Sequence, residues 1–143
     1  MARVANDKIR EQRAYEYFKG LDEKKRPVWV KDIAERGAVF INPGKCYRNG
    51  ISYNAGLNRY LWCQTIYDKE DMRFKGGLGI FDSSEPWGPW TTVYYAEQWD
   101  VGPGETSSFP TKWMSRDGKT CYLLFSGEDC FSVRKVMLRE ISH

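Results

Sequence analysis

Carboxylates, arginines and hydroxyl groups are the side chains with which this chain of 143 residues could do chemistry. The single histidine, His143, is the last residue, where chains usually fray. A Ser-His-Asp triad or a histidine metal site within one chain is therefore nearly excluded. The four cysteines show no Cys-x-x-Cys spacing, which argues against a zinc or redox motif. We expect no metal site and no cofactor.

The strongest candidates for ligand contact are Glu105 and Arg48, because each precedes a predicted inner strand. Glu105 follows Gly102-Pro103-Gly104, where a catalytic or ligand-facing acid would be well placed. A solvated loop carboxylate or a turn-capping acceptor is the alternative for Glu105. Arg48 could bind a carboxylate or a sugar acid through two hydrogen bonds, or it could form a structural ion pair.

Further ligand contacts are predicted from aromatic and polar residues. Tyr53 and Asn54 could line the same ligand-binding opening as Arg48. Tyr53 would offer a ring platform and Asn54 a hydrogen-bond partner. Trp87 is better placed to be exposed than Trp90, which we expect to pack between sheets. Asp129 is either a rim ligand or a turn residue. The remaining ligand-binding candidates are Ser107, Lys112 and Trp113.

Composition excludes several functional classes. The 22 Lys and Arg exceed the 19 Asp and Glu by a formal charge of +3, which is too small for the concentrated basic face of a nucleic-acid protein. An aromatic content of 15% is high for a disordered chain. No stretch approaches the roughly 20 apolar residues of a membrane span, and the first residues lack the apolar core of a signal peptide. We therefore expect a cytoplasmic protein with no membrane and no nucleic-acid partner.

The pattern along the chain is typical of short antiparallel strands. Residues 7–19 could begin as a short helix and then alternate like a strand. From residue 50 onward, strand-like runs separated by turn residues form a four-stranded meander, the unit of a propeller blade. Its strands are expected at 51–54, 59–66, 78–81 and 90–95. A second set is expected at 109–114, 120–126 and 131–139.

A repeat accompanies these strands. Gly56 and Gly118 are 62 positions apart, and so are Tyr60 and Tyr122. An offset near 60 indicates a reused supersecondary unit, which must stack on neighbours to bury its faces. We therefore predict an all-β single domain over 1–143, a partial β-propeller of about two blades. Its parts are a strand pair at 14–32, a blade at 46–97 and an incomplete blade at 105–140.

Residues 79–90 contain Gly-Ile-Phe-Asp followed by Glu-Pro-Trp-Gly-Pro-Trp. This phrase resembles one in five-bladed β-propeller proteins related to glycoside hydrolases, both family-43-like enzymes and uncharacterised relatives. Similar stretches cover most of residues 14–139 and match the C-terminal blades of a longer propeller. The resemblance implies a five-fold propeller relationship and a carbohydrate-type ligand.

The resemblance does not imply that this chain is catalytic. Hydrolases of this kind place three carboxylates around the axis, each from a different blade, and glycoside hydrolysis needs at least two. Residues 46–54 contain no Asp or Glu, and Glu105 alone precedes the second inner strand. Whether the protein is an enzyme is therefore left open.

Sets of two, four and three strands would leave blade faces and strand edges exposed, so we expect self-association. The N-terminal strands of one chain could complete the C-terminal sheet of another in a homo-oligomer. Alternatively, the N-terminal segment folds over as a helix and caps a monomer. The expected function is carbohydrate binding or processing in a cleft at the blade axis. The alternative is a non-enzymatic protein-interaction module that assembles through exposed blade faces.

Overall fold

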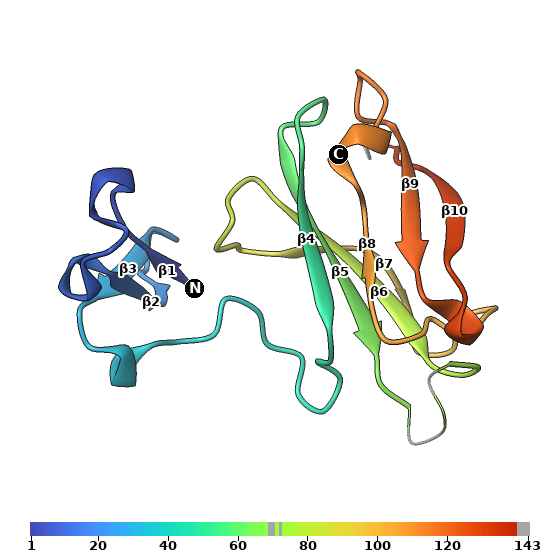
Figure 1. Cartoon of the computed structure of the whole chain (residues 1–143), viewed down its shortest axis with the longest axis horizontal. Helices are drawn as coiled ribbons and strands as arrows, with labels where there is room; N and C mark the ends of the chain where they lie inside the picture. The colour runs from blue at the N-terminus through green and yellow to red at the C-terminus, as the bar shows by residue number, and fades with distance from the viewer. Residues whose placement is uncertain (69–70, 72, 140–143) are drawn as a thin grey trace. The chain divides into compact units, whose positions relative to one another are not determined.

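The protein is an all-β chain in the computed structural model, which describes residues 1–68, 71 and 73–139 (Figure 1). Its strands form antiparallel sheets of three, four and three strands, and the described residues contain no α-helix. The expected all-β class with antiparallel sheets is confirmed, whereas closure into propeller blades stays a prediction. None of the described helical turns has the length and apolar character that a membrane crossing requires.

The strands belong to two compact units, and the first comprises residues 1–41 with 87–89. Its sheet has the order β1-β2-β3, formed by β1 (Ala2–Arg3), β2 (Glu16–Leu21) and β3 (Pro27–Val30). The predicted N-terminal helix is wrong. Two 3-10 turns, η1 (Asn6–Lys8) and η2 (Gln12–Ala14), precede β2, and neither contains a buried residue. A short helix without a buried apolar face is unstable in water, which explains the difference.

The second unit comprises residues 42–86 and 90–143 and contains the four-stranded meander. Its order is β4-β5-β6-β7. The strands are β4 (Asn49–Asn54), β5 (Arg59–Ile66), β6 (Gly77–Ser83) and β7 (Thr91–Ala96). Strands β5 and β6 are central and buried on both faces, while the edge strand β7 is largely exposed. This sheet follows the meander expected from the sequence.

A three-stranded sheet completes the second unit, with the order β10-β9-β8. It is formed by β8 (Ser107–Ser108), β9 (Thr120–Phe125) and β10 (Ser132–Met137). The strand predicted at 109–114 is wrong, because β8 ends before Phe109 and a 3-10 turn, η4, occupies Thr111–Trp113. Pro110 has no N–H to donate to a neighbouring strand, and it immediately precedes this turn. Residue 140 of the predicted incomplete blade and His143 lie outside the described residues.

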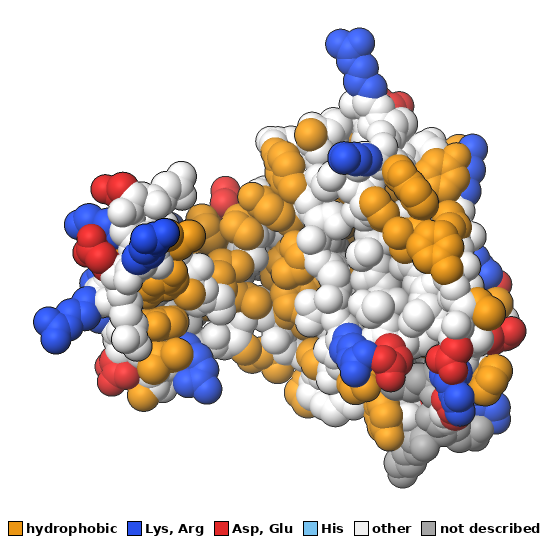
Figure 2. Space-filling model, in the orientation of Figure 1, with side chains coloured by type: hydrophobic (Ala, Val, Ile, Leu, Met, Phe, Trp, Pro, Cys, Tyr) orange, Lys and Arg blue, Asp and Glu red, His pale blue; other side chains and the backbone are white. Residues whose placement is uncertain are grey.

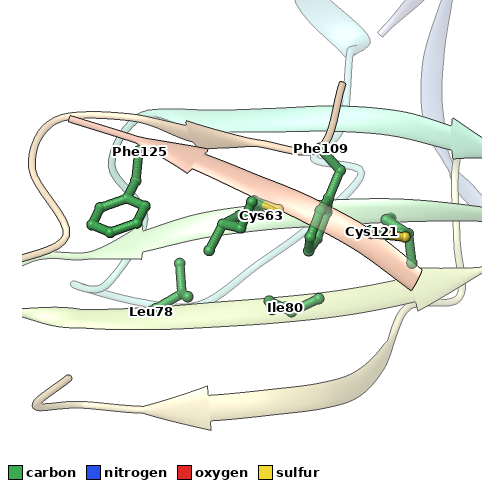
Figure 3. Packing of buried hydrophobic residues seen from close by; sticks show 8 residues of the cluster. Cys63, Leu78, Ile80, Phe109, Cys121 and Phe125 are labelled. Atoms are coloured by element: carbon green, nitrogen blue, oxygen red, sulfur yellow. The ribbon is translucent and has the colours of Figure 1, made fainter. Parts of the chain in front are cut away.

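The core of the second unit lies between its two sheets (Figure 3). The side chains that meet there alternate along β5, β6 and β9, as the period of two in a strand requires. The four-stranded sheet contributes Leu61, Cys63, Leu78 and Ile80; the other side contributes Phe109, Cys121, Leu123 and Phe125. Removing such side chains from water stabilises the fold by roughly 1.5–3 kcal/mol for each large apolar one.

The observed strand register gives a repeat offset of 61 residues, one fewer than the predicted 62. Asn54 pairs with Arg59 across the first hairpin, and Ser115 N donates to Thr120 O across the second, so the two hairpins are 61 positions apart. The predicted 62-residue offset came from matching glycines, which occupy different positions in the two turns. A shift of one residue exchanges the two faces of a strand. The residue equivalent to Tyr122 is therefore Leu61 and not Tyr60.

Candidate functional site

Arg48 and Glu105 are brought together at one end of the second unit because β4 and β8 begin side by side. A Cβ atom at Gly50, in β4, would lie 2.5 Å from Ser107 O, in β8, so glycine permits the close approach of the two backbones. The Arg48 Nη1 atom donates a hydrogen bond to Glu105 Oε2. The two side chains remain 57% and 54% exposed. Figure 2 shows acidic and basic side chains beside one another at the lower end of this unit.

The backbone before Glu105 is held by close packing. Gly102, Pro103 and Gly104 are buried, and Glu105 N donates a 3.0 Å hydrogen bond to Ser126 Oγ. Gly104 has φ +67°, and a Cβ atom there would lie 2.3 Å from Ser126 O. Glycine suits both the left-handed conformation and the contact. The carboxylate therefore extends from a fixed loop into solvent.

Aromatic rings lie beside Arg48. The Arg48 guanidinium carbon is 5.6 Å from the centre of the Tyr47 ring, within the range of a cation–π interaction. The Tyr47 and Tyr67 rings are 6.2 Å apart and are 40% and 46% exposed. The guanidinium thus has a ring and a carboxylate as neighbours, and both tyrosines are partly exposed.

A groove of about 410 Å³ runs beside β8 and the end of β9. Its polar lining includes Thr106, Ser108 and Asp129. Phe131 forms part of its wall and is 75% exposed, which is unusual for a large apolar ring. The groove therefore combines an exposed ring with hydroxyl and carboxylate groups, next to the loop that carries Glu105.

Asp129 is fixed by Arg73. Its Oδ2 atom accepts a 3.1 Å hydrogen bond from Arg73 Nη1, and Glu128 N donates to Arg73 O at 2.8 Å. Arg73 also hydrogen-bonds Asp71, which lowers the pKa of the Asp71 carboxyl and raises the pKa of the guanidinium. Glu128 and Asp129 have φ of +54° and +56°, a conformation that costs a non-glycine residue about 1–2 kcal/mol. This strained loop presents Asp129 at the groove.

Tyr53 and Asn54 lie at the other end of β4, roughly 13 Å along the strand from Asn49. Tyr53 is 40% exposed, donates to Asn58 Oδ1 and packs 4.9 Å from the Tyr60 ring. Asn54 is fully buried, and its Nδ2 atom donates a 2.8 Å hydrogen bond to Gly118 O. Asn54 therefore holds the two hairpins of the second unit together, and it does not line the same opening as Arg48.

The other predicted ligand residues are distributed over the molecule. Ser107 also lines the groove, but it is only 1% exposed, and its Oγ atom has no partner among the described residues. Lys112 and Trp113 line a shallow hollow of about 670 Å³ beside β9. Trp87 belongs to the first unit, where its ring meets Trp29 edge-on at 6.0 Å. The structure thus brings Ser107 and Asp129 to the end of the second unit where Arg48 and Glu105 meet. The other predicted ligand residues lie away from that end: Tyr53, Asn54, Trp87, Lys112 and Trp113.

Thiol chemistry is confined to two exposed cysteines. All four cysteines are free, and Cys63 and Cys121 are buried in the core. Burial raises the pKa of both thiols, so neither is a nucleophile near neutral pH. Among the described residues, no group of three His, Cys, Asp or Glu side chains could hold a metal ion.

No protein-family model matches the sequence, and no curated protein matches it either. The assignment of function therefore depends on the geometry of the second unit. Sequence reasoning missed Phe131, Tyr47 and Thr106 in this region. Tyr47 could have been found as the neighbour of Arg48, whereas the exposure of Phe131 depends on tertiary structure.

Proposed function

We propose that the protein binds carbohydrate at the end of the second unit where Arg48 and Glu105 meet. The observation that supports this most strongly is the Arg48–Glu105 pair beside a groove with an exposed Phe131 ring. The resemblance of residues 79–90 to propeller proteins related to glycoside hydrolases supports the same class of ligand.

A sugar presents an apolar face of C–H groups and an edge of hydroxyl groups. Phe131 offers a ring for the face, as do Tyr47 and Tyr67 beside Arg48. The carboxylate of Glu105 accepts hydrogen bonds from hydroxyl groups, and the guanidinium of Arg48 donates them. Bonds to charged groups are stronger than neutral ones, and a few placed polar groups in an apolar groove fix a ligand's orientation.

The arrangement favours binding over hydrolysis. Hydrolysis of a glycosidic bond needs one carboxyl group that donates a proton and a second that acts as base or nucleophile. Here both candidate acids are engaged by arginines, Glu105 by Arg48 and Asp129 by Arg73. Carboxylates in such pairs serve as hydrogen-bond acceptors, which suits recognition.

The experiment begins with a glycan array on the wild-type protein, followed by calorimetry with the glycan that binds best. Glu105→Gln and Arg48→Gln each remove one charged hydrogen-bonding partner, worth roughly 1.5–3 kcal/mol. We expect each variant to weaken binding about ten- to a hundredfold. The control is Glu23→Gln, which makes the same change at an exposed position in the first unit and should leave affinity unchanged.

Two results would overturn the proposal. A folded wild-type protein that binds no glycan would leave the protein-interaction module as the better function. Tight glycan binding that is unaffected in both Glu105→Gln and Arg48→Gln would place the sugar at another surface. Phe131→Ala extends the test, because loss of an exposed ring should weaken binding without lowering stability.

A further inference from the structure

A trench lies along one side of the second unit, between β7 and β10. Each of these two strands is an edge strand of its sheet, and β8, at the other edge of the three-stranded sheet, lies beside β4. The trench consists of two adjoining hollows of about 230 and 370 Å³, which share Val93 and Leu138 in their walls. We call the two hollows together the edge trench.

The floor of the edge trench is apolar and belongs to the core. Leu78 and Ile80, in β6, and Leu123, in β9, line it although they are only 1%, 4% and 1% exposed. Leu78 and Ile80 lie between the two sheets (Figure 3). Val136 and Leu138 add a wall from the β10 side and pack against the same core. An apolar body in the trench would therefore extend the core, and its burial is favourable.

A β-bulge in β7 shapes the middle of the edge trench. Ile80, in β6, pairs with Tyr94. The next residue, Phe81, pairs with Thr92, so Val93 is an extra residue in β7. A bulge bends an edge strand and changes the direction of a side chain. Val93 is 45% exposed and lines both hollows, so the bulge places an apolar side chain where the hollows meet.

Charged side chains mark the smaller hollow. Asp82 follows Leu78 and Ile80 on the same face of β6, because alternate residues of a strand share a face. Its Oδ2 atom accepts a 2.8 Å hydrogen bond from Arg59 Nε, and the two side chains are 22% and 35% exposed. Arg139 lines the same hollow. Two guanidinium groups thus stand against one carboxylate, and this excess of positive charge favours an anion.

The cations of the larger hollow are placed differently. Arg134 Nη1 donates a 2.7 Å hydrogen bond to Asp100 Oδ1, and the guanidinium carbon lies 4.5 Å from the centre of the Trp99 ring. This hydrogen bond lowers the pKa of the Asp100 carboxyl, so the pair is ionised at neutral pH. Lys135 reaches the larger hollow from the exposed face of β10. The smaller hollow is therefore the better place for an anionic head group.

We propose that the edge trench binds a medium-chain fatty acid, an unbranched acyl chain that ends in a carboxylate. The carboxylate lies between Arg139 and the Nη groups of Arg59, because Arg59 uses Nε for Asp82 and guanidinium groups bind carboxylates through paired hydrogen bonds. The acyl chain lies over Ile80 and Leu78. Asp82 and Leu78 are about 13 Å apart along β6, which suits a chain of the length of decanoate.

This inference goes beyond the proposed carbohydrate binding. The edge trench lies between β7 and β10, whereas Arg48 and Glu105 precede β4 and β8. The trench therefore offers a second site, with a ligand of a different chemical class.

The test is isothermal titration calorimetry of the full chain with decanoate below its micelle-forming concentration. Decanol has the same chain without the charge, and butyrate has the same head group on a shorter chain. We expect decanoate to bind, and each of the other two to bind at least tenfold more weakly. Arg139→Gln removes a charged hydrogen-bonding partner and should weaken decanoate binding about ten- to a hundredfold. The matched control is Arg116→Gln, at an exposed arginine of the second hairpin, which should leave the affinity unchanged.

A second pair of variants tests the position of the acyl chain. Val93 and Val133 are both 45% exposed, but Val93 lines the edge trench, whereas Val133 lines the hollow beside Trp113. Val93→Glu should weaken decanoate binding at least tenfold, because it places a negative charge beside the chain, and Val133→Glu should not. If Val93→Glu fails to fold, nuclear magnetic resonance of the wild type replaces it. Decanoate should then shift the methyl resonances of Ile80 and Leu138 and leave those of Ile51, in β4, unchanged.

A folded wild-type protein that does not bind decanoate overturns the proposal. So does decanol that binds as tightly as decanoate, since the arginines would then have no role, and so does unchanged decanoate affinity in Arg139→Gln. An equal loss in Val93→Glu and Val133→Glu, or unshifted Ile80 and Leu138 methyl groups, also overturns it. Glu105→Gln should bind decanoate like the wild type whether or not it binds glycan, which separates failure of this proposal from failure of the carbohydrate site.

Discussion

Replacing Asn54 by alanine should destabilise the second unit without affecting the proposed carbohydrate binding. Asn54 is fully buried and joins the two hairpins: its Nδ2 atom donates to Gly118 O at 2.8 Å, and its Oδ1 atom accepts from Leu57 N at 3.1 Å. The approach is close, since a Cβ atom at Gly56 would lie 2.2 Å from Gly118 N. Water has little room to replace the lost amide.

The magnitude follows from the two groups that lose a partner. A buried donor or acceptor left without a hydrogen bond costs about 1–3 kcal/mol. Gly118 O retains only a weak contact with the Cys121 thiol, at 3.5 Å, and Leu57 N loses its side-chain acceptor. We therefore expect Asn54→Ala to lower the free energy of unfolding by about 2–5 kcal/mol. A loss of this size lowers Tm by roughly 10 °C in a domain of this length.

Urea unfolding followed by circular dichroism measures the change, with Asn49→Ala as the control in the same strand. Asn49 is exposed, so its substitution should change stability by no more than about 0.5 kcal/mol. The folded fraction of Asn54→Ala should bind glycan as the wild type does. Equal stability of the two variants would refute the structural role of Asn54, and selective loss of glycan binding would restore it as a ligand residue.

Three further predictions concern the core. A thiol reagent at neutral pH should label Cys46 and Cys130 quickly in the native protein and should label Cys63 and Cys121 only after unfolding. Burial raises the pKa of the Cys63 thiol, so above pH ~8.5 this thiol ionises only in the unfolded state. The free energy of unfolding in urea should therefore be constant below that pH and should fall above it, with a smaller fall in Cys63→Val. Phe109→Ala should cost about 3–5 kcal/mol in urea unfolding, because the ring is 1% exposed in the core.

The meander was predictable because its signals are local. The hairpin residues 55–58 and 116–119 are rich in Gly, Asn and Asp, and alternating apolar residues flank them. The second sheet was harder to predict. Strand β8 has only two residues, and Phe109, which looks like a strand residue in sequence, is buried just after the strand ends. Its burial depends on the sheet opposite, which no local pattern specifies.

The candidate site was predictable only in part, because some of its signals are local in the sequence and others are not. Arg48 precedes β4 and Glu105 precedes β8, and neighbouring strands bring such residues together when they begin at the same end. The spacing could not show that Tyr53 and Asn54 lie at the opposite end of β4. Phe131 gave no signal in the sequence, because a large apolar ring is usually buried and its 75% exposure is a property of the tertiary structure.

The fold fixes the backbone at the end of the second unit where Arg48 and Glu105 meet. At the Arg48 and Glu105 end, Gly50 allows β4 and β8 to approach, and the buried segment 102–104 fixes the loop before the carboxylate. Preorganised polar groups lose little entropy when they bind a small polar ligand, as the proposed carbohydrate site requires.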